Sequence, residues 1–412
     1  MLDTFRLSAK LLKTFIGHAH RVNSIAYPAF DGGQFLCSGS HDKTVRVWDM
    51  DTTEQIQLFD GHSSYVYCVK FSPYHYHKHH RHVICSSSND KTIRFWDIKH
   101  NRQLERFNKH IWGISGIEFS PFNCGQYLCS ASYDRTIRLW DIETSNSLHV
   151  FNGHEDYIFC VDFSPLQSNN NCNEKSNGIG VIGGNGYTIC SGSFDKSIRI
   201  WDIETAKKLL SLKGHTDSVM SVKYGSNKLG INGVANTILS GSMDKSVRLW
   251  DIRSGQQIQL FTGHTSWAMA VEYSPFEVND DKVGGNSNVI CSGSLDNTVC
   301  FWDIRSNKGL YVIKGSDERD SGEVDGIYCL EFLPLKRKSK NSGDRGVLFV
   351  FGGSIIFPTI KTFFGYLFFF FLNEIYFTYF SHFLNVLLVY WSNFCMRYHI
   401  RSKKIFATYA LS

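Results

Sequence analysis

Residues 191–205 read SGSFDKSIRIWDIET, and this stretch decides the fold because it recurs along the 412-residue chain. The dipeptide Trp-Asp occurs six times, and an aspartate stands six residues before each of these tryptophans. A Gly-His pair precedes five of the six copies, and Lys109-His110 takes its place before the third copy. A pattern repeated at this spacing predicts a chain built from repeated supersecondary units.

Each of the six units contains a histidine, an aspartate and a tryptophan, together with a serine in a segment SGS, SSS or SAS. In chain order they are His18, Asp42 and Trp48; His62, Asp90 and Trp96; His110, Asp134 and Trp140; His154, Asp195 and Trp201; His215, Asp244 and Trp250; and His264, Asp296 and Trp302. A single Ser-His-Asp set would suggest nucleophilic catalysis. Sixfold recurrence favours a structural hydrogen-bond network instead, because an active site is built once. We therefore expect neither enzymatic activity nor a cofactor.

These motifs resemble the WD40-repeat family over roughly residues 11–335. The resemblance implies an all-β fold, a β-propeller of four-stranded blades around a central channel. It also implies a scaffold that binds other proteins or peptides, with no small-molecule substrate.

The residues of the second unit agree with such a blade. The segment SSYVYCVKFSP (63–73) alternates as a strand, with Tyr67, Val69 and Phe71 on one face and Val66 and Cys68 on the other. Further strands are predicted for HVICSSS, TIRFW and RQLERF, with NDK as a polar turn.

A seventh unit begins at residues 323–334 and continues at 346–354, but no Trp-Asp strand follows. Residues 10–16 read as a fourth strand without a preceding blade, which in the family completes the last blade and closes the ring. We therefore predict a seven-bladed propeller over residues 1–354 with an incomplete seventh blade, followed by an apolar tail over 355–412.

The tail allows three interpretations. Residues 375–396 contain no Lys, Arg, Asp or Glu over 22 positions, which is long enough for a transmembrane helix. The tail could also be a divergent remainder of the seventh blade with an apolar appendage, or translated non-coding sequence. A membrane is an expected partner only in the first of these cases.

Composition separates the two parts of the chain. Residues 346–412 hold 14 of the 32 phenylalanines and contribute +4 of the net charge of +5, so the propeller is nearly neutral. A neutral body argues against direct binding of nucleic acid.

Cysteines recur at equivalent strand positions, which indicates small buried residues in a reducing compartment. The N-terminal residues lack a secretory pattern, so a cytoplasmic or nuclear location is expected.

One position early in each first strand varies from unit to unit. In the family this position lies near the channel mouth, where partners dock, and aromatic or methionine side chains there would form an adaptable surface. The alternative is simple packing between blades. The predicted partner-binding residues are Asn23, Tyr67, Ser115, Phe159, Met220, Met269 and Tyr328.

Two resemblances to subfamilies suggest particular roles. EDYIFCVDF with SGSFDKSIRIWDIET resembles the WD-repeat subunit of histone H3 lysine methyltransferase complexes, with Phe159 and Tyr328 at the positions that grip an arginine. WDIR, at 250–253 and 302–305, resembles the motif by which substrate receptors contact the adaptor of cullin-RING ubiquitin ligases. Arg253 and Arg305 would make that contact.

Three other segments could carry chemistry. The run YHYHKHHRH (74–82) contains five histidines, and we interpret it as an exposed flexible loop and not as a metal site. Loops rich in Asn and Gly at 166–186, 225–236 and 276–288 are expected on one rim of the ring. KRKSK (336–340) reads as a solvated loop, with a nuclear-localisation signal as the alternative.

Overall fold

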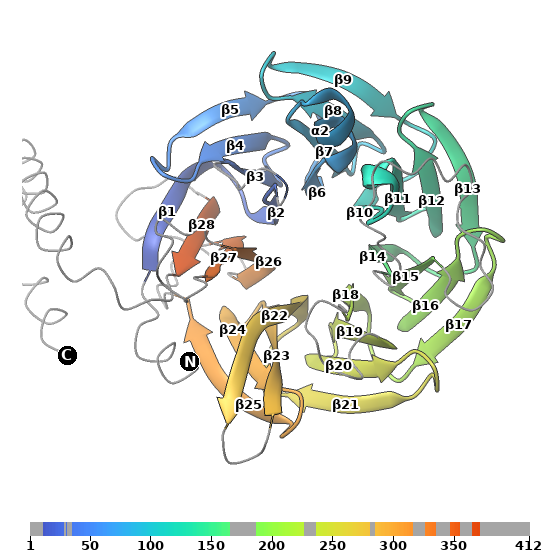
Figure 1. Cartoon of the computed structure of the whole chain (residues 1–412), viewed down its shortest axis with the longest axis vertical. Coiled ribbons are helices and arrows are strands. Elements are labelled where there is room, and N and C mark those ends of the chain that lie inside the picture. Colours follow the sequence, from blue (N-terminus) through green and yellow to red (C-terminus); the bar gives the residue numbers. More distant parts are fainter. Residues whose placement is uncertain are drawn as a thin grey trace, which may run out of the picture.

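The chain forms an all-β propeller (Figure 1). The structure, a computed structural model, describes residues 11–28, 30, 35–164, 187–225, 236–280, 285–315, 326–334, 347–354 and 365–370. Six antiparallel sheets of four consecutive strands are arranged around a common axis as blades, with the first strand of each nearest the axis (Figure 1). The six complete units predicted from the sequence are thereby confirmed.

The strands of the six blades follow one another in chain order. Blades one to three are β2 (Val22–Ala26), β3 (Phe35–Ser40), β4 (Val45–Asp49) and β5 (Gln55–Phe59); β6 (Val66–Phe71), β7 (Val83–Ser88), β8 (Ile93–Asp97) and β9 (Arg102–Phe107); and β10 (Ile114–Phe119), β11 (Tyr127–Ser132), β12 (Thr136–Asp141) and β13 (Asn146–Asn152). Blades four to six are β14 (Ile158–Phe163), β15 (Thr188–Ser193), β16 (Ser197–Asp202) and β17 (Lys208–Lys213); β18 (Val219–Tyr224), β19 (Thr237–Ser242), β20 (Ser246–Asp251) and β21 (Gln257–Thr262); and β22 (Ala268–Asp280), β23 (Gly285–Ser294), β24 (Thr298–Asp303) and β25 (Lys308–Lys314).

A further four-stranded sheet combines the two ends of the described chain. It contains β1 (Leu11–His18), β28 (Gly365–Phe370), β27 (Val347–Ser354) and β26 (Gly326–Pro334), in that order across the sheet. Strand β1 pairs antiparallel with β28, which lies within the stretch that the sequence assigned to the tail.

A tight turn joins the second and third strands of every blade. In blade two, Asp90 accepts the backbone N–H of Thr92, and Lys91 between them has a φ of 69°. The same left-handed conformation recurs at Lys43, Arg135, Lys196, Lys245 and Asn297. The aspartate bond offsets the cost of this conformation in a residue other than glycine, which explains why Asp occurs at the same place in each unit.

The core lies between neighbouring blades. Phe59 at the end of β5 stacks on Trp96 of the next blade with ring centroids 5.2 Å apart, and Phe107 stacks on Trp140 at 4.9 Å. Each large apolar residue at the end of an outer strand therefore fills the space beside the tryptophan of the following unit. Burial of both faces of every blade explains why the inner strands are apolar on both sides.

The histidine run 74–82 is not a flexible loop, and that prediction is wrong. Residues Pro73–His79 form helix α2, with Tyr74 and His75 buried. Ser72 caps its N-terminus by accepting from the His75 backbone, Pro73 occupies the first turn, and His80 ends it in a left-handed conformation. These local caps make a short helix stable where the histidines alone suggested a solvated loop.

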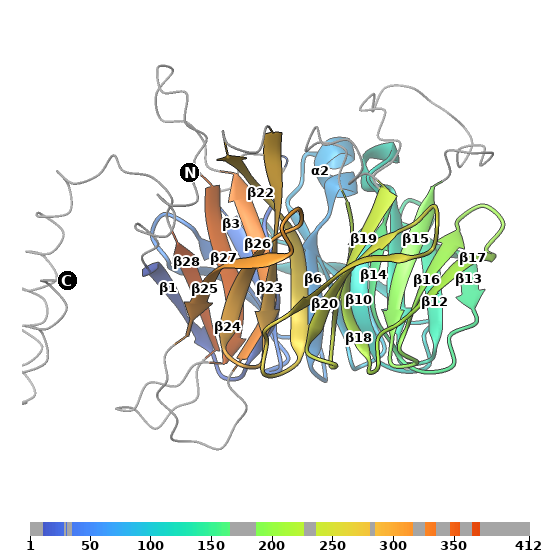
Figure 2. The ribbon, with the colours of Figure 1, turned by 90° about the horizontal axis from the view of Figure 1, so that it is seen from below.

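The predicted loop at 276–288 is also corrected. Strands β22 and β23 continue into it as a hairpin, with Glu277 paired to Asn288 and Asp280 to Gly285. An antiparallel pair satisfies its own backbone groups, so it can extend beyond the blade (Figure 2).

The inner strands do not alternate simply, which corrects the assignment of Tyr67 to the same face as Val69. The pairing register of β6 with β7 shifts between Val66 and Cys68, so Tyr67 lies in a β-bulge. Such a bulge bends the strand and redirects a side chain.

Several predictions concern residues outside the described ranges. These are the transmembrane segment 375–396, the basic run 336–340, most of the loops 166–186 and 225–236, and the N-terminal sequence before Leu11. Within the ranges that the structure describes, no helix is long and apolar enough to cross a membrane.

Candidate protein-interaction site

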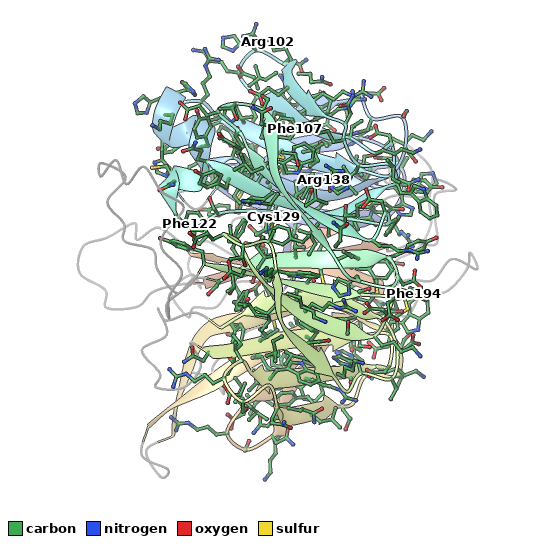
Figure 3. All side chains as sticks on the ribbon, turned by 90° about the vertical axis from the view of Figure 1, so that its right-hand side faces the viewer. Arg102, Phe107, Phe122, Cys129, Arg138 and Phe194 are labelled. Carbon is green, nitrogen blue, oxygen red and sulfur yellow. The ribbon has the colours of Figure 1, made fainter. Side chains whose placement is uncertain are left out.

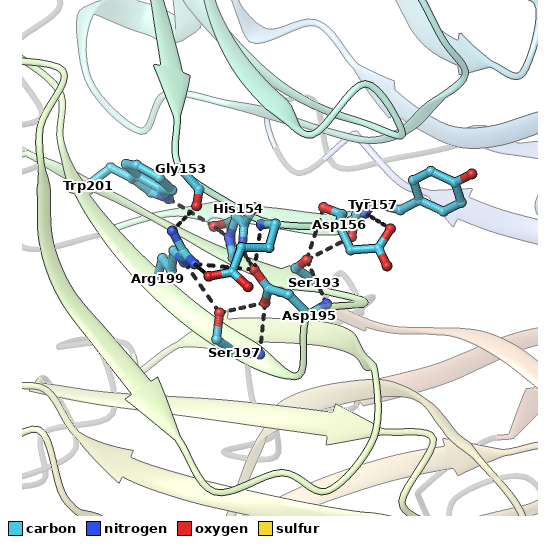
Figure 4. A network of polar contacts seen from close by, with 12 residues as sticks. Gly153, His154, Asp156, Tyr157, Ser193, Asp195, Ser197, Arg199 and Trp201 are labelled. Carbon is cyan, nitrogen blue, oxygen red and sulfur yellow. Dashed lines mark hydrogen bonds and ion pairs between the residues drawn. The ribbon is translucent and has the colours of Figure 1, made fainter.

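The histidine, serine, aspartate and tryptophan of each unit form one hydrogen-bonded tetrad. Figure 4 shows His154, Asp195 and Trp201 of the blade-four network. In blade four, His154 Nδ1 lies 2.6 Å from Asp195 Oδ2, and His154 Nε2 lies 2.7 Å from Ser191 Oγ. Trp201 Nε1 donates to the same serine oxygen at 2.8 Å. Equivalent bonds occur in the other five blades, with donor–acceptor distances of 2.7–2.9 Å.

The tetrads are built for stability and not for nucleophilic attack. The serine hydroxyl is fully buried in every blade and lies between histidine and tryptophan, so no substrate can reach it. Burial lowers the pKa of five of the histidines, His18, His62, His110, His154 and His215, although the aspartates oppose this. Burial opposes ionisation of the aspartates, but their hydrogen bonds to histidine outweigh it and hold their pKa well below the usual range.

Blade six differs in the residue that lies beside its tetrad aspartate. In four blades an arginine lies 3.4–3.8 Å from the tetrad aspartate, at Arg46, Arg94, Arg199 and Arg248. Cys300 occupies the equivalent position in blade six. Burial opposes protonation of His264, but Asp296 and Cys300 outweigh it and raise the pKa of His264 to about 9.

All seven predicted partner-binding positions lie at the same structural point. Each stands near the start of an inner strand, at the place where the pairing register shifts, and each is half-buried; they are Asn23, Tyr67, Ser115, Phe159, Met220, Met269 and Tyr328. Two of them donate hydrogen bonds to backbone carbonyls of the next blade: Asn23 to the Val66 carbonyl at 2.7 Å and Ser115 to the Ile158 carbonyl. The remaining side chains vary in chemistry around the ring.

A second set of residues, which was not predicted from the sequence, lies beside these. In each of the six turns between second and third strands, one variable residue stands between the last serine and the aspartate; these residues are His41, Asn89, Tyr133, Phe194, Met243 and Leu295. Its backbone N–H donates to the residue before the inner strand, for example Phe194 to Tyr157 at 2.8 Å. The feature of the sequence that could have identified this residue is its variability within an otherwise repeated turn. We call the side of the ring that carries these six residues the turn face.

Rings on the turn face make a continuous chain of contacts over blades one to four. His41 stacks on Tyr65 at 4.0 Å and contacts Tyr67 at 6.0 Å. Tyr67 contacts Tyr133 at 5.6 Å, and Tyr133 contacts Phe159 at 5.8 Å. Phe159 then contacts Phe194 at 6.2 Å, and Phe194 is 42% exposed. Figure 3 shows Phe194 at one rim of the ring and Phe122 at the opposite rim.

Arg21 borders this aromatic chain on the turn face. Its Nη1 donates to the Tyr328 hydroxyl at 3.1 Å and its Nη2 to His41 Nε2 at 2.7 Å. The guanidinium carbon lies 4.8 Å from the centroid of the Tyr328 ring.

Charged side chains recur at a later position of the inner strands and join neighbouring blades. Lys70 Nζ lies 2.6 Å from Glu118 Oε2, and Lys223 Nζ lies 3.4 Å from Glu272 Oε2. Burial raises the pKa of Asp162 to about 6 and that of Glu331 to about 7, with the two lysines opposing the shift. Among the described residues, Lys70 and Lys223 pair with Glu118 and Glu272, and neither Asp162 nor Glu331 has an ion pair of its own.

The opposite side of the ring, the loop face, carries α2, the short turn η1 (Asn123–Gly125) and the ends of the third strands (Figure 2). Arg253 and Arg305 lie there, two residues after the Trp-Asp pairs, and both are exposed. With the Asn236 amide oxygen facing it, the Arg253 guanidinium donates at 2.8 and 3.1 Å. Within the described ranges, no three His, Cys, Asp or Glu side chains are grouped to hold a metal ion.

The repeated blades and their tetrads define a WD40 β-propeller, and this chain belongs to the WD40 family, described as "WD domain, G-beta repeat". The matching segments together cover more than half of the chain and end with the third strands; they are residues 9–49, 53–97, 101–141, 145–202, 206–251 and 255–303. The family is generally one of protein-interaction scaffolds.

Similar proteins match only short parts of the chain. WD repeat and SOCS box-containing protein 1 of Xenopus tropicalis is 40% identical over 67 residues, which is 16% of either protein, and the human protein of that name is 39% identical over the same length. The human peroxisomal targeting signal 2 receptor is 35% identical over 63 residues, 15% of this chain and 20% of the receptor. The alignments therefore span less than a quarter of these relatives.

Proposed function

We propose that this chain is a non-catalytic scaffold that binds segments of other proteins on its turn face. One observation carries the proposal: a repeated frame of tetrads presents bulged residues that differ from blade to blade. Side chains held on rigid strands but free to vary in chemistry suit recognition of a specific partner. The name of one relative, a targeting-signal receptor, agrees with recognition of a protein segment.

The test compares proteins that co-purify with the tagged wild-type chain and with Phe159→Ala or Tyr328→Ala. We expect at least one partner to be depleted about tenfold or more by these truncations, while the melting temperature stays close to wild type. Leu209→Ala, which truncates an exposed residue of the outer strand β17, is the matched control and should retain every partner. Equal partner sets in all variants would refute docking on the turn face, and unfolding by Phe159→Ala would favour packing as its role.

We also infer that the sheet of β1, β28, β27 and β26 is the seventh blade and closes the ring. Two contacts support this. Phe15 of β1 meets Trp48 at 5.6 Å, as Phe59 meets Trp96. Gly352 of β27 packs closely against Val22 of blade one, since a Cβ added to it would lie 3.0 Å from that valine. Gly39 packs in the same way against Val66 of the next blade. Closure removes open strand edges, and on this view the propeller extends beyond residue 354.

A role as substrate receptor of a cullin-RING ligase is a second candidate. The exposure of Arg253 and Arg305 at the same point of two successive blades supports it. In a pull-down with purified ligase adaptor, the double variant Arg253→Ala/Arg305→Ala should lose binding and Phe159→Ala should retain it.

The alternative is a subunit of a histone methyltransferase complex, in which Phe159 and Tyr328 would grip an arginine. The same pull-down with that complex in place of the ligase adaptor tests this role. For either role we propose a cytoplasmic or nuclear location.

A further inference from the structure

Arg21 is a cation whose hydrogen-bond partners are both neutral. The Tyr328 phenol accepts from Nη1, and His41 Nε2 accepts from Nη2, which requires an uncharged imidazole. Burial, together with Arg21 itself, lowers the pKa of His41 to about 3, so this histidine stays neutral near pH 7. The third guanidinium nitrogen, Nε, is buried and has no hydrogen-bond partner among the described residues.

Four of the five repeat arginines differ from Arg21 in this respect, whereas Arg138 of blade three also has a buried Nε without a hydrogen-bond partner. Arg46, Arg94, Arg199 and Arg248 each lie within 3.8 Å of a tetrad carboxylate. Among the residues that the structure describes, Arg21 forms no ion pair. Asp42, close to it in sequence, already accepts from His18, Ala19 and Thr44. A half-buried guanidinium without a counter-charge is costly, and a charge-assisted bond to an oxyanion would offset that cost.

The surroundings of Arg21 favour a carboxylate over a phosphate. A single guanidinium matches one negative charge, while a phosphate ester carries nearly two. The Tyr328 ring lies against the guanidinium, His41 accepts a hydrogen bond from it, and Tyr65 stacks on His41. Rings beside a charge lower the local dielectric, so a bond formed there is stronger. Tyr65 is 41% exposed and offers apolar surface beside His41.

We propose that Arg21 binds the carboxylate of an aspartate or glutamate in a partner peptide, with an adjacent aromatic or aliphatic residue packed on Tyr65. This inference rests on the proposed function, since it assigns the partner's chemistry to one part of the turn face. It predicts an acidic residue in the partner at one fixed position.

The experiment selects binders to the wild-type chain from a bead library of random nonapeptides, with a second library carrying a fixed phosphoserine. We expect Asp or Glu to be enriched at one position, and the affinity of the selected peptides to fall about tenfold in Arg21→Gln. Arg135→Gln is the control, because Arg135 is an exposed arginine on the same face, in the turn between the second and third strands of blade three. It should leave the preference unchanged.

Each other outcome overturns the inference. Selection of phosphopeptides alone, absence of acidic enrichment, or an enrichment unchanged by Arg21→Gln would each contradict it. Should Arg21→Gln unfold, Arg21→Lys keeps the charge without the planar fork, and it must retain the acidic preference at reduced affinity. Peptides that lack acidic residues but are lost in Phe159→Ala would refute the role of Arg21 and leave the scaffold proposal standing. Peptides indifferent to every turn-face variant, Phe159→Ala and Arg21→Gln included, would refute both.

Discussion

The Sγ of Cys300 lies 3.8 Å from Nδ1 of His264, at the position where the other five units carry arginine. The tetrad of blade six therefore differs in its electrostatics from tetrads of otherwise the same geometry. His264 is the tetrad histidine whose pKa is raised, to about 9, whereas burial lowers the pKa of the other five.

The blade-six tetrad should make stability depend on alkaline pH. Because the folded-state pKa of His264 lies above the unfolded value, its stabilisation is complete below about pH 6.5 and is lost as the pH rises through about 9. Cys300→Arg should lower this pKa as in the other blades. The difference in free energy of unfolding between wild type and variant should change by on the order of 2–3 kcal/mol across that range. Urea unfolding at several pH values measures it, and parallel curves for the two proteins would contradict the prediction.

Loss of one tetrad histidine should destabilise the fold. His215→Ala leaves Ser240 and Asp244 without their shared partner in a buried site. We expect the free energy of unfolding to fall by roughly 2–3 kcal/mol, measured in urea, with partner selectivity unchanged. His20→Ala, which removes an exposed imidazole, is the control and should have little effect. Selective loss of one partner without destabilisation would argue that His215 takes part in recognition.

Closure of the ring by β1 can be tested at two adjacent residues. Phe15 is fully buried against Trp48, whereas Ile16 is 56% exposed. Phe15→Ala should cost about 3–5 kcal/mol of stability, as expected for a large core side chain. Ile16→Ala should change stability by no more than about 0.5 kcal/mol. Equal and small effects in thermal and urea unfolding would show that β1 adds nothing to the propeller.

The carboxyl group of Glu331 should make the protein less stable as the pH rises, which is the opposite of the pH dependence expected from acidic residues in strong ion pairs. Its folded-state pKa is raised to about 7 by burial, so its contribution is most favourable below about pH 4.5 and is lost as the pH rises through about 7. The stability of Glu331→Gln relative to wild type should therefore be greater at pH 8 than at pH 5, by about 1 kcal/mol after allowance for solvent screening. Glu155→Gln, at an exposed residue, is the matched control. A relative stability independent of pH would contradict the raised pKa.

Much of the propeller could be predicted because its determinants are local and repeated. The Trp-Asp pairs, the turn aspartates and the Gly-His segments fixed the number of complete blades and the members of each tetrad. The five second-strand cysteines are buried as predicted, at Cys37, Cys85, Cys129, Cys190 and Cys291. Helix α2 was missed because its caps, Ser72 and Pro73, are weak signals beside a run of histidines.

The sequence by itself determined the repeat, the spacing of its polar residues and the variable position at the start of each inner strand, because these depend on neighbours within one unit. The tertiary structure alone decided what those positions face. The bulge at Tyr67 depends on register with the next strand, which no alternation pattern reveals. The bond from Arg21 to Tyr328 joins residues 307 positions apart, and such a contact exists only once the chain has folded into its ring and brought the two strands together.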